Sequence, residues 1–124
     1  MAAPTTPLYK DYPLKVINTP KFKTGKTDPF TIEGSHMALS HNSFIRGFNS
    51  IYQQAQRVPQ QDKKDFVGYC IAWWDCVAQH HHYEETEFFP AIDKATGQKG
   101  LMDGAVEQHG KGTINRCYAF NQFD

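Results

Sequence analysis

Hydrophobic residues recur every three or four positions over most of the chain, a pattern that predicts helices and no strands of any length. A first helix is expected to begin near Gly34–Ser35, with Ser35 as its cap. The break at 57–61, which contains Pro59, should end it. The apolar stripe of this helix consists of Met37, His41, Phe44, Phe48, Ile51 and Ala55.

A second, longer helix is predicted from about Lys63 to about Lys94. At 1.5 Å per residue it would be roughly 45 Å long. Pro90 should kink it or force a looser turn, because proline lacks an N–H and its ring clashes with the preceding turn. Gly97 and Gly100 should end it, and a third helix is expected to start at 101–103 with Met102, Val106 and His109 on one stripe.

The first 33 residues differ from the rest, because they hold five of the seven prolines. Apolar residues are scattered among these prolines, so we expect an extended N-terminal arm laid over a helical domain rather than a featureless tail. The expected organisation is therefore an arm, 1–33, and an all-α domain, 34–124.

Composition and charge narrow the class of protein. The 124 residues suffice for one small domain, and 13 basic side chains balance 13 acidic ones, which favours neither nucleic acid nor a membrane surface as a partner. No apolar run is long enough to span a membrane, and the N-terminus lacks the features of a signal peptide. The three cysteines form no CxxC pair. We interpret them as reduced, small core residues of an intracellular, cytoplasmic protein.

The segment 80–90 concentrates the candidate chemistry, with three histidines and three glutamates followed by Phe88-Phe89-Pro90. Residues four apart share a helix face, so His80 lies beside Glu84 and His81 beside Glu85. A carboxylate next to an imidazole on an inward face needs a cation, either a protonated histidine or a metal ion. The stripes through His80 and His81 are both apolar, so periodicity leaves the register open.

Each of the three predicted helices offers a histidine on its apolar side: His41, then His80 with Glu84, then His109. Metal sites in helical bundles are built in this way from facing helices. Imidazole and carboxylate without a thiolate pair suit iron, manganese or zinc, and Glu85 could add an oxygen. His36 and His82 are expected to point away.

Three sequence blocks resemble the hemerythrin-like family, also called HHE cation-binding domains, and especially its fungal branch. Residues 41–52, HNSFIRGFNSIY, are similar to that branch's HNxxIRGxNxIY. Residues 80–90 are similar to its HxxxEExxxFP signature, and the third block combines GQKGLM at 97–102 with EQH at 107–109. The resemblance covers about residues 36–110 and implies a four-helix bundle around two irons.

The resemblance also implies the ligands and the activity. The family's second-helix ligand lies ten residues before the proline, which is His80, with Glu84 and Glu85 as its oxygen donors. The other ligands map to His41 and His109. Members bind dioxygen, sense oxygen or iron, or carry out oxygen-dependent chemistry, and the fungal habit suggests specialised metabolism with a small-molecule substrate.

Two departures from the family pattern shape the expectations. Thr113 stands where true hemerythrins carry a second histidine, and the sequence lacks the fourth helix. We therefore expect three helices of a four-helix up-down bundle, whose five donors hold one or two non-haem irons. Tyr9, Tyr12, Val16 and Ile17 of the arm, or a second chain in a homodimer, would cover the apolar strip left bare. The alternative is a catalytically silent helical module whose histidines are structural or bind metal weakly.

Overall fold

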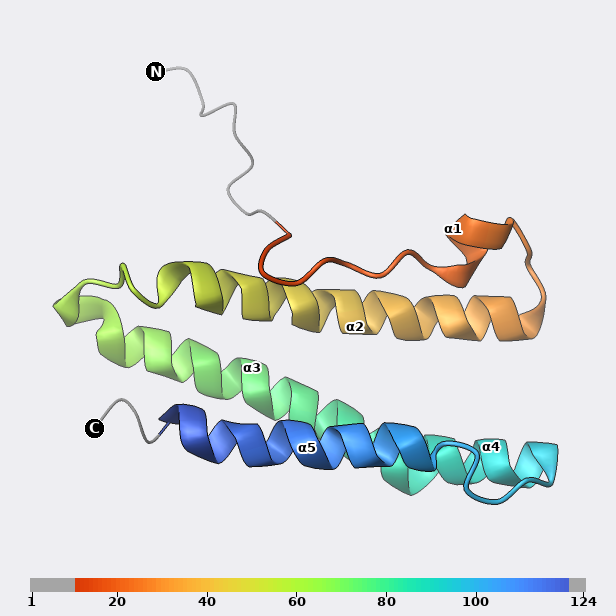
Figure 1. Ribbon diagram of the computed structural model, residues 1–124. Coiled ribbons are helices and arrows are strands. Elements are labelled where there is room, and N and C mark those ends of the chain that lie inside the picture. The colour runs from red at the N-terminus through yellow and green to blue at the C-terminus, as the bar shows by residue number, and fades with distance from the viewer. Residues whose placement is uncertain (1–10, 121–124) are drawn as a thin grey trace. The chain divides into compact units, whose positions relative to one another are not determined.

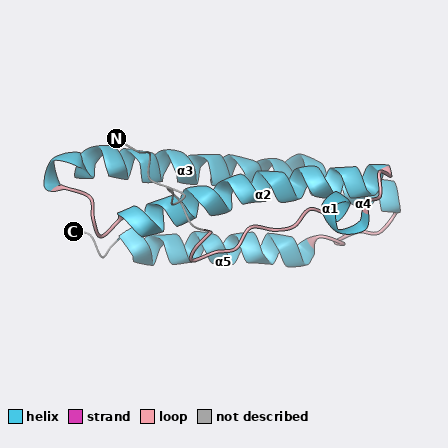
Figure 2. Ribbon diagram, turned by 90° about the horizontal axis from the view of Figure 1, so that it is seen from above, coloured by secondary structure: helices cyan, strands magenta, loops and turns pink. Residues whose placement is uncertain are grey.

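The computed structural model describes the backbone of residues 11–120 and the side chains of residues 11–111. Every regular element within this part of the chain is helical, and none is a strand (Figures 1 and 2). The predicted all-α class is confirmed. The elements in chain order are α1 (Pro20–Thr24), α2 (Pro29–Gln54), the 3₁₀ turn η1 (Gln60–Asp62), α3 (Lys63–Tyr83), the π-helical turn η2 (Glu84–Phe88), α4 (Phe89–Thr96) and α5 (Asp103–Phe120).

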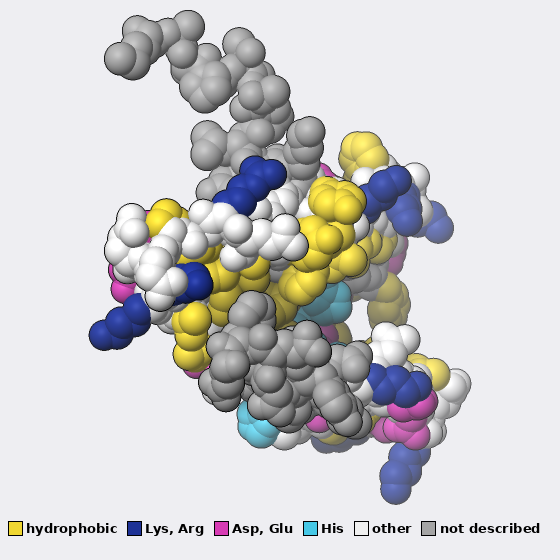
Figure 3. Space-filling view, turned by 60° about the vertical axis from the view of Figure 1, so that its left-hand side comes forward, with side chains coloured by type: hydrophobic (Ala, Val, Ile, Leu, Met, Phe, Trp, Pro, Cys, Tyr) yellow, Lys and Arg dark blue, Asp and Glu magenta, His cyan; other side chains and the backbone are white. Residues whose placement is uncertain are grey.

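The chain divides into two compact units, Met1–Trp74 and Asp75–Asp124, whose positions relative to one another are not determined. Among the described residues, no helix is both long and apolar enough to cross a membrane. Hydrophobic side chains reach the surface in Figure 3, and the largest exposed ones include Phe22, Phe30 and Leu39.

In the first unit, α2 begins earlier than the sequence pattern predicted. Its cap is Asp28, whose carboxylate accepts a hydrogen bond of 3.0 Å from the Thr31 N–H, and Pro29 occupies the first helical position. Both residues are common at helix starts. The cap accepts a hydrogen bond from a backbone N–H that has no partner within the helix, and proline at the first position sacrifices no helical hydrogen bond. The predicted start at Gly34–Ser35 is wrong, and Ser35 is a buried residue inside the helix.

The arm is shorter than predicted, because α1 and the start of α2 lie within 1–33. Residues 11–19 run beside α2 without regular structure, as Figure 1 shows. The exposed fractions of Tyr12 and Ile17 are 58% and 42%, so these side chains bury little apolar surface, while Val16 is half-buried. Tyr9 lies outside the described residues. Hydrogen bonds from its backbone to side chains of α2 hold this segment, together with an edge-on contact between the rings of Tyr12 and Tyr52 at 5.9 Å.

A glycine lets α2 approach the first part of α3. A Cβ built on Gly47 would lie 2.5 Å from Cδ1 of Trp73, closer than any side chain could be accommodated without movement. The indole Nε1 of Trp73 donates to the carbonyl of Phe44 at 3.0 Å, and its ring lies 5.8 Å from that of Phe48. Gly47 therefore makes room for a tryptophan that packs on α2 and hydrogen-bonds to it.

The predicted long helix is present, and it begins in the first unit and continues through the second. The helical segments α3, η2 and α4 together span 63–96, and η2 lies just before Pro90, where a looser turn was predicted. Gly97 ends α4 with a positive φ of 68°, a conformation that favours glycine. Asp93 accepts from the N–H groups of Gly100 and Leu101, which fixes the turn into α5. Cys76 is exposed, so its prediction as a core residue is wrong.

Candidate metal centre

Glu84 is the centre of the histidine and glutamate cluster. Its side chain is only 3% exposed, although it is the first residue of the π-helical turn. Nε2 of His80 lies 3.3 Å from its Oε1, and Nε2 of His109 lies 3.4 Å from its Oε2. Each carboxylate oxygen thus faces one imidazole nitrogen, the first from α3 and the second from α5. The predicted neighbourhood of His80, Glu84 and His109 is present within the second unit.

Glu85 contacts the other nitrogen of His109. Nδ1 of His109 donates to Oε1 of Glu85 at 2.8 Å. A carboxylate only accepts, and a neutral imidazole has one N–H, so the two ring nitrogens of His109 cannot both donate unless the ring carries a second proton. With the proton on Nδ1, the lone pair of Nε2 faces Glu84 and is available to a cation lying between them. Glu85 would then fix the tautomer that a metal requires.

His81 also belongs to the cluster, although the resemblance to the hemerythrin-like pattern implied only His80 as the ligand of this helix. Its ring lies flat on that of His109, with centroids 3.7 Å apart and planes 5° apart. His81, Glu84 and His109 each offer one ligand atom, and these atoms all lie within 4.8 Å of one another. The signal was present in the sequence, because His81 and Glu84 are three residues apart and such pairs also share a helix face.

The backbone positions these donors through the π-helical turn. The Phe89 N–H bonds to the carbonyl of Glu84, five residues back, instead of following the α-helical ladder. A regular α-helix would bring the ring of Pro90 against the carbonyl of Thr86, and the wider turn relieves that clash. Phe89 is buried, and its ring lies 6.0 Å from that of His109. Phe89, which directly follows the turn, therefore provides an apolar neighbour for the ring of His109.

Burial lowers the pKa of His80 below its ordinary value of 6.5, and the charge of the nearby His109 lowers it further. The neutral imidazole is the form that binds a metal ion, because its lone pair is free. Desolvation, the larger cause, thus favours the neutral form of His80 that a metal requires, and a protonated His109 would favour it further.

The cluster's distances fit a metal ion. Two ligand atoms, each about 2.1 Å from one ion, lie about 3.0 Å apart at a right angle and about 3.4 Å apart at the tetrahedral angle. The separations of 3.3 Å and 3.4 Å from Glu84 to His80 and His109 fall in this range. Nitrogen and carboxylate donors together suit iron, manganese and zinc. The residues are therefore able to hold a metal ion.

The other predicted site residues have different outcomes. His41 lies in the middle of α2, half-buried, in the first unit, so its participation stays a prediction. His36 and His82 are exposed, as predicted, and His36 lies near the exposed Glu33. Thr113 lies on α5 beyond the residues whose side chains the structure describes.

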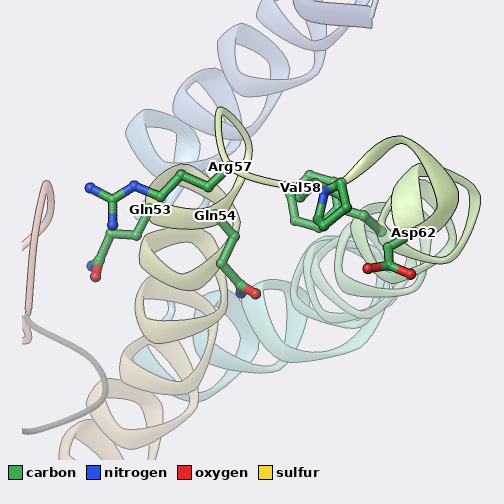
Figure 4. Close-up of a pocket in the computed structure, with 7 residues that line it drawn as sticks. Gln53, Gln54, Arg57, Val58 and Asp62 are labelled. Atoms are coloured by element: carbon green, nitrogen blue, oxygen red, sulfur yellow. The ribbon is translucent and has the colours of Figure 1, made fainter.

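A hollow at the α2–α3 connection offers much less chemistry. Its volume is about 380 Å³, and Figure 4 shows the side chains that line it, among them Arg57 and Asp62. Its lining contains no histidine or cysteine and only one carboxylate, that of Asp62. The cluster around Glu84 is therefore the better candidate site.

Fold and cluster together define an all-helical chain with a histidine and glutamate group able to hold a metal ion. No family model, curated protein or solved structure matches the chain. The resemblance to hemerythrin-like domains therefore rests on the three sequence blocks alone.

Proposed function

We propose that the chain binds a transition-metal ion through His81, Glu84 and His109, with His80 and Glu85 completing or supporting the site. The observation that carries the proposal is the burial of the Glu84 carboxylate between two imidazole nitrogens. A buried carboxylate is costly without a cation, and a neutral His80 cannot supply the charge. A metal ion would neutralise Glu84 and bind the imidazole lone pairs in one step.

We further propose that the metal is non-haem iron, with one or two ions, and that the protein binds dioxygen or supports an oxygen-dependent oxidation. Iron held by nitrogen and oxygen donors would supply the one-electron chemistry that dioxygen needs. The donor set supports this choice, and the hemerythrin-like sequence blocks favour it over zinc or manganese. His41 stays the predicted further ligand.

One observation favours a second candidate, the catalytically silent module. His109 contacts a carboxylate at both ring nitrogens, so a protonated His109 could neutralise Glu84 and Glu85 without any metal. In that case the cluster would be an internal ion-pair network that stabilises the second unit.

Metal analysis separates the two candidates. Protein purified without an affinity tag or chelator should contain iron at one or two atoms per chain and show the near-ultraviolet absorption of ferric iron. Glu84→Gln should lose the metal, whereas Glu87→Gln, a matched change at an exposed position, should keep it. Stoichiometric zinc would overturn the choice of iron and leave the site intact. A chain that neither contains nor takes up iron, zinc or manganese would establish the silent module.

A further inference from the structure

One face of α2 binds the arm through the backbone of the arm. Four polar side chains lie along this face at intervals of seven, seven and four residues, and each contacts a backbone N–H or carbonyl of 12–21. The pairs are Ser35 with Lys21, Asn42 with Ile17, Asn49 with Leu14 and Gln53 with Tyr12. The residue numbers of the arm rise along the four pairs while those of α2 fall, so the arm runs antiparallel to the helix (Figure 1).

The two asparagines each make a pair of hydrogen bonds. Oδ1 of Asn49 accepts from the Leu14 N–H at 3.0 Å, and its Nδ2 donates to the Leu14 carbonyl at 2.7 Å. Asn42 repeats this with Ile17, at 2.6 Å and 2.8 Å. A neighbouring β-strand satisfies an extended residue with the same two bonds. Each asparagine therefore substitutes for one residue of a missing strand.

The repeat distances of the helix and of the extended arm agree. Seven residues of α-helix rise about 10.5 Å, and three residues of extended chain span about 10 Å. Asn42 and Asn49 are seven apart, while Ile17 and Leu14 are three apart. One stripe of α2 is thus in register with an extended peptide.

The hydrogen bonds of this face are directed at the backbone of the arm, while Tyr12 and Asp11 add side-chain contacts with Tyr52 and Arg46. Asn49 is only 2% exposed, whereas Leu14, the residue it binds, is 45% exposed. A hollow of about 500 Å³, lined by Asp11, Arg46 and Asn49 among others, lies beside this part of the arm, so the arm's side chains do not fill the surface there. What the face requires is an N–H at two positions three residues apart. Proline cannot meet that requirement, and the nearby prolines stand at 13 and 20 instead.

We propose that this face of α2 is a binding site for an extended peptide, occupied in cis by residues 12–17, and that its trans ligand is the same segment of a second copy of the chain. The hydrogen bonds go to backbone groups of the segment, and Tyr12 adds a ring contact with Tyr52 at 5.9 Å. A second copy supplies the same segment, so its contacts are identical to those made in cis. The arm joins α2 through a turn at Gly25, where φ is 68°, and a short connection to Asp28. Tethering favours the cis contact at low concentration, and exchange of arms between two copies follows at high concentration.

The test releases the arm while leaving the site intact. Leu14→Pro with Ile17→Pro in the full chain removes the two N–H groups that the asparagines bind. A fluorescein-labelled peptide of residues 11–19, followed by anisotropy, should bind this variant at least tenfold more tightly than it binds the wild-type chain, whose site is occupied. Adding Asn42→Ala and Asn49→Ala should abolish the gain. A Val16→Pro peptide is the matched control, since residue 16 lies between the two contacts, and it should bind as the wild-type peptide does.

Two measurements guard against misfolding and test exchange. Circular dichroism checks that the variants keep their helices. If the proline variant unfolds, amide exchange decides, because the Leu14 and Ile17 amides of the wild-type chain should exchange at least tenfold more slowly than in Asn42→Ala. Light scattering should show concentration-dependent dimers of the wild-type chain that Asn42→Ala with Asn49→Ala removes. Equal peptide binding by all variants, no binding to a folded proline variant, unprotected amides in wild type, or dimers unaffected by the asparagines would overturn the proposal.

Discussion

The imidazole ring of His109 lies flat against that of His81, with ring centroids 3.7 Å apart and ring planes 5° apart. The stacked pair joins the end of α3 to α5, and a carboxylate oxygen of Glu84 lies within 4.8 Å of a ring nitrogen of each histidine. Stacking fixes the orientation of His109 and leaves its ring edges to contact Glu84 and Glu85. His81 thus has two proposed functions, stacking on His109 and donating a lone pair to a metal ion, and a substitution can separate them.

His81→Phe should separate them. Phenylalanine can stack on His109 but cannot bind a metal, so the fold should be retained while metal affinity falls at least tenfold. Competition titration with a chromophoric chelator measures the affinity. His82→Phe is the matched control, because His82 is exposed and the next residue along. Unchanged affinity in His81→Phe would assign metal binding to His80 instead.

Glu84→Gln should remove the stabilisation that metal gives. A metal at a hundredfold excess over its Kd stabilises the folded chain by about 2.7 kcal/mol. For a chain of this size that raises the Tm by roughly 10 °C, which calorimetry with and without metal measures. The glutamine variant should show the same Tm in both conditions, and Glu87→Gln should behave as wild type. A full metal shift in Glu84→Gln would show that the ion is bound elsewhere.

Gly47→Ala should destabilise the first unit, because its Cβ would lie 2.5 Å from the Trp73 ring. Overpacking of this kind typically costs about 1–3 kcal/mol. Gly68→Ala provides the contrast: no neighbouring atom lies within 4 Å of the new Cβ, and alanine favours helix by roughly 0.5–1 kcal/mol. Urea unfolding followed by tryptophan fluorescence measures both. Destabilisation by Gly68→Ala as large as by Gly47→Ala would contradict the tight contact.

Acid should weaken the start of α2. The Thr31 hydroxyl and the Thr31 N–H, both bonded to Asp28, lower the pKa of its carboxyl from 3.8. Because the folded pKa lies below the unfolded value, the cap's contribution is complete above about pH 4 and is lost as the pH falls through the folded pKa. The Tm difference between wild type and Asp28→Ala should therefore be largest near neutral pH and shrink toward pH 2. Asp28→Asn caps without titrating, so its difference from Asp28→Ala should persist.

The sequence predicted the features that depend on short-range spacing. The long helix with its loose turn before Pro90, the start of α5 and the approach of His80 to Glu84 all follow from residues at most four apart. The apolar stripe also pointed to His109, which lies 3.4 Å from Glu84, while its role as a metal ligand stays a prediction. The start of α2 was missed because the Asp28–Pro29 signal lies in a proline-rich stretch that was interpreted as extended.

The roles of Asn42 and Asn49 were beyond any periodicity. Polar residues on a helix usually face water, and their partners here are backbone groups 25 and 35 residues away. Backbone groups carry no residue-specific signal, since every residue except proline offers the same N–H and carbonyl. Only the fold shows that this polar face is covered. Coverage by the arm explains why Asn49, a polar residue, is among the most buried side chains described.

The π-helical turn at Glu84–Phe88 changes the rotational register of its helix, so that residues before and after it follow two different registers. Each residue advances an α-helix by about 100°, so a turn wider by one residue rotates every side chain after it by about that angle. His80 and His81 follow the register before the turn, and Phe89 follows the register after it. Deleting one residue between 84 and 88 would restore a single register, but it would bring the ring of Pro90 back against the carbonyl four residues before it. A homologous chain without the wide turn should therefore align with this one through a one-residue gap at this place.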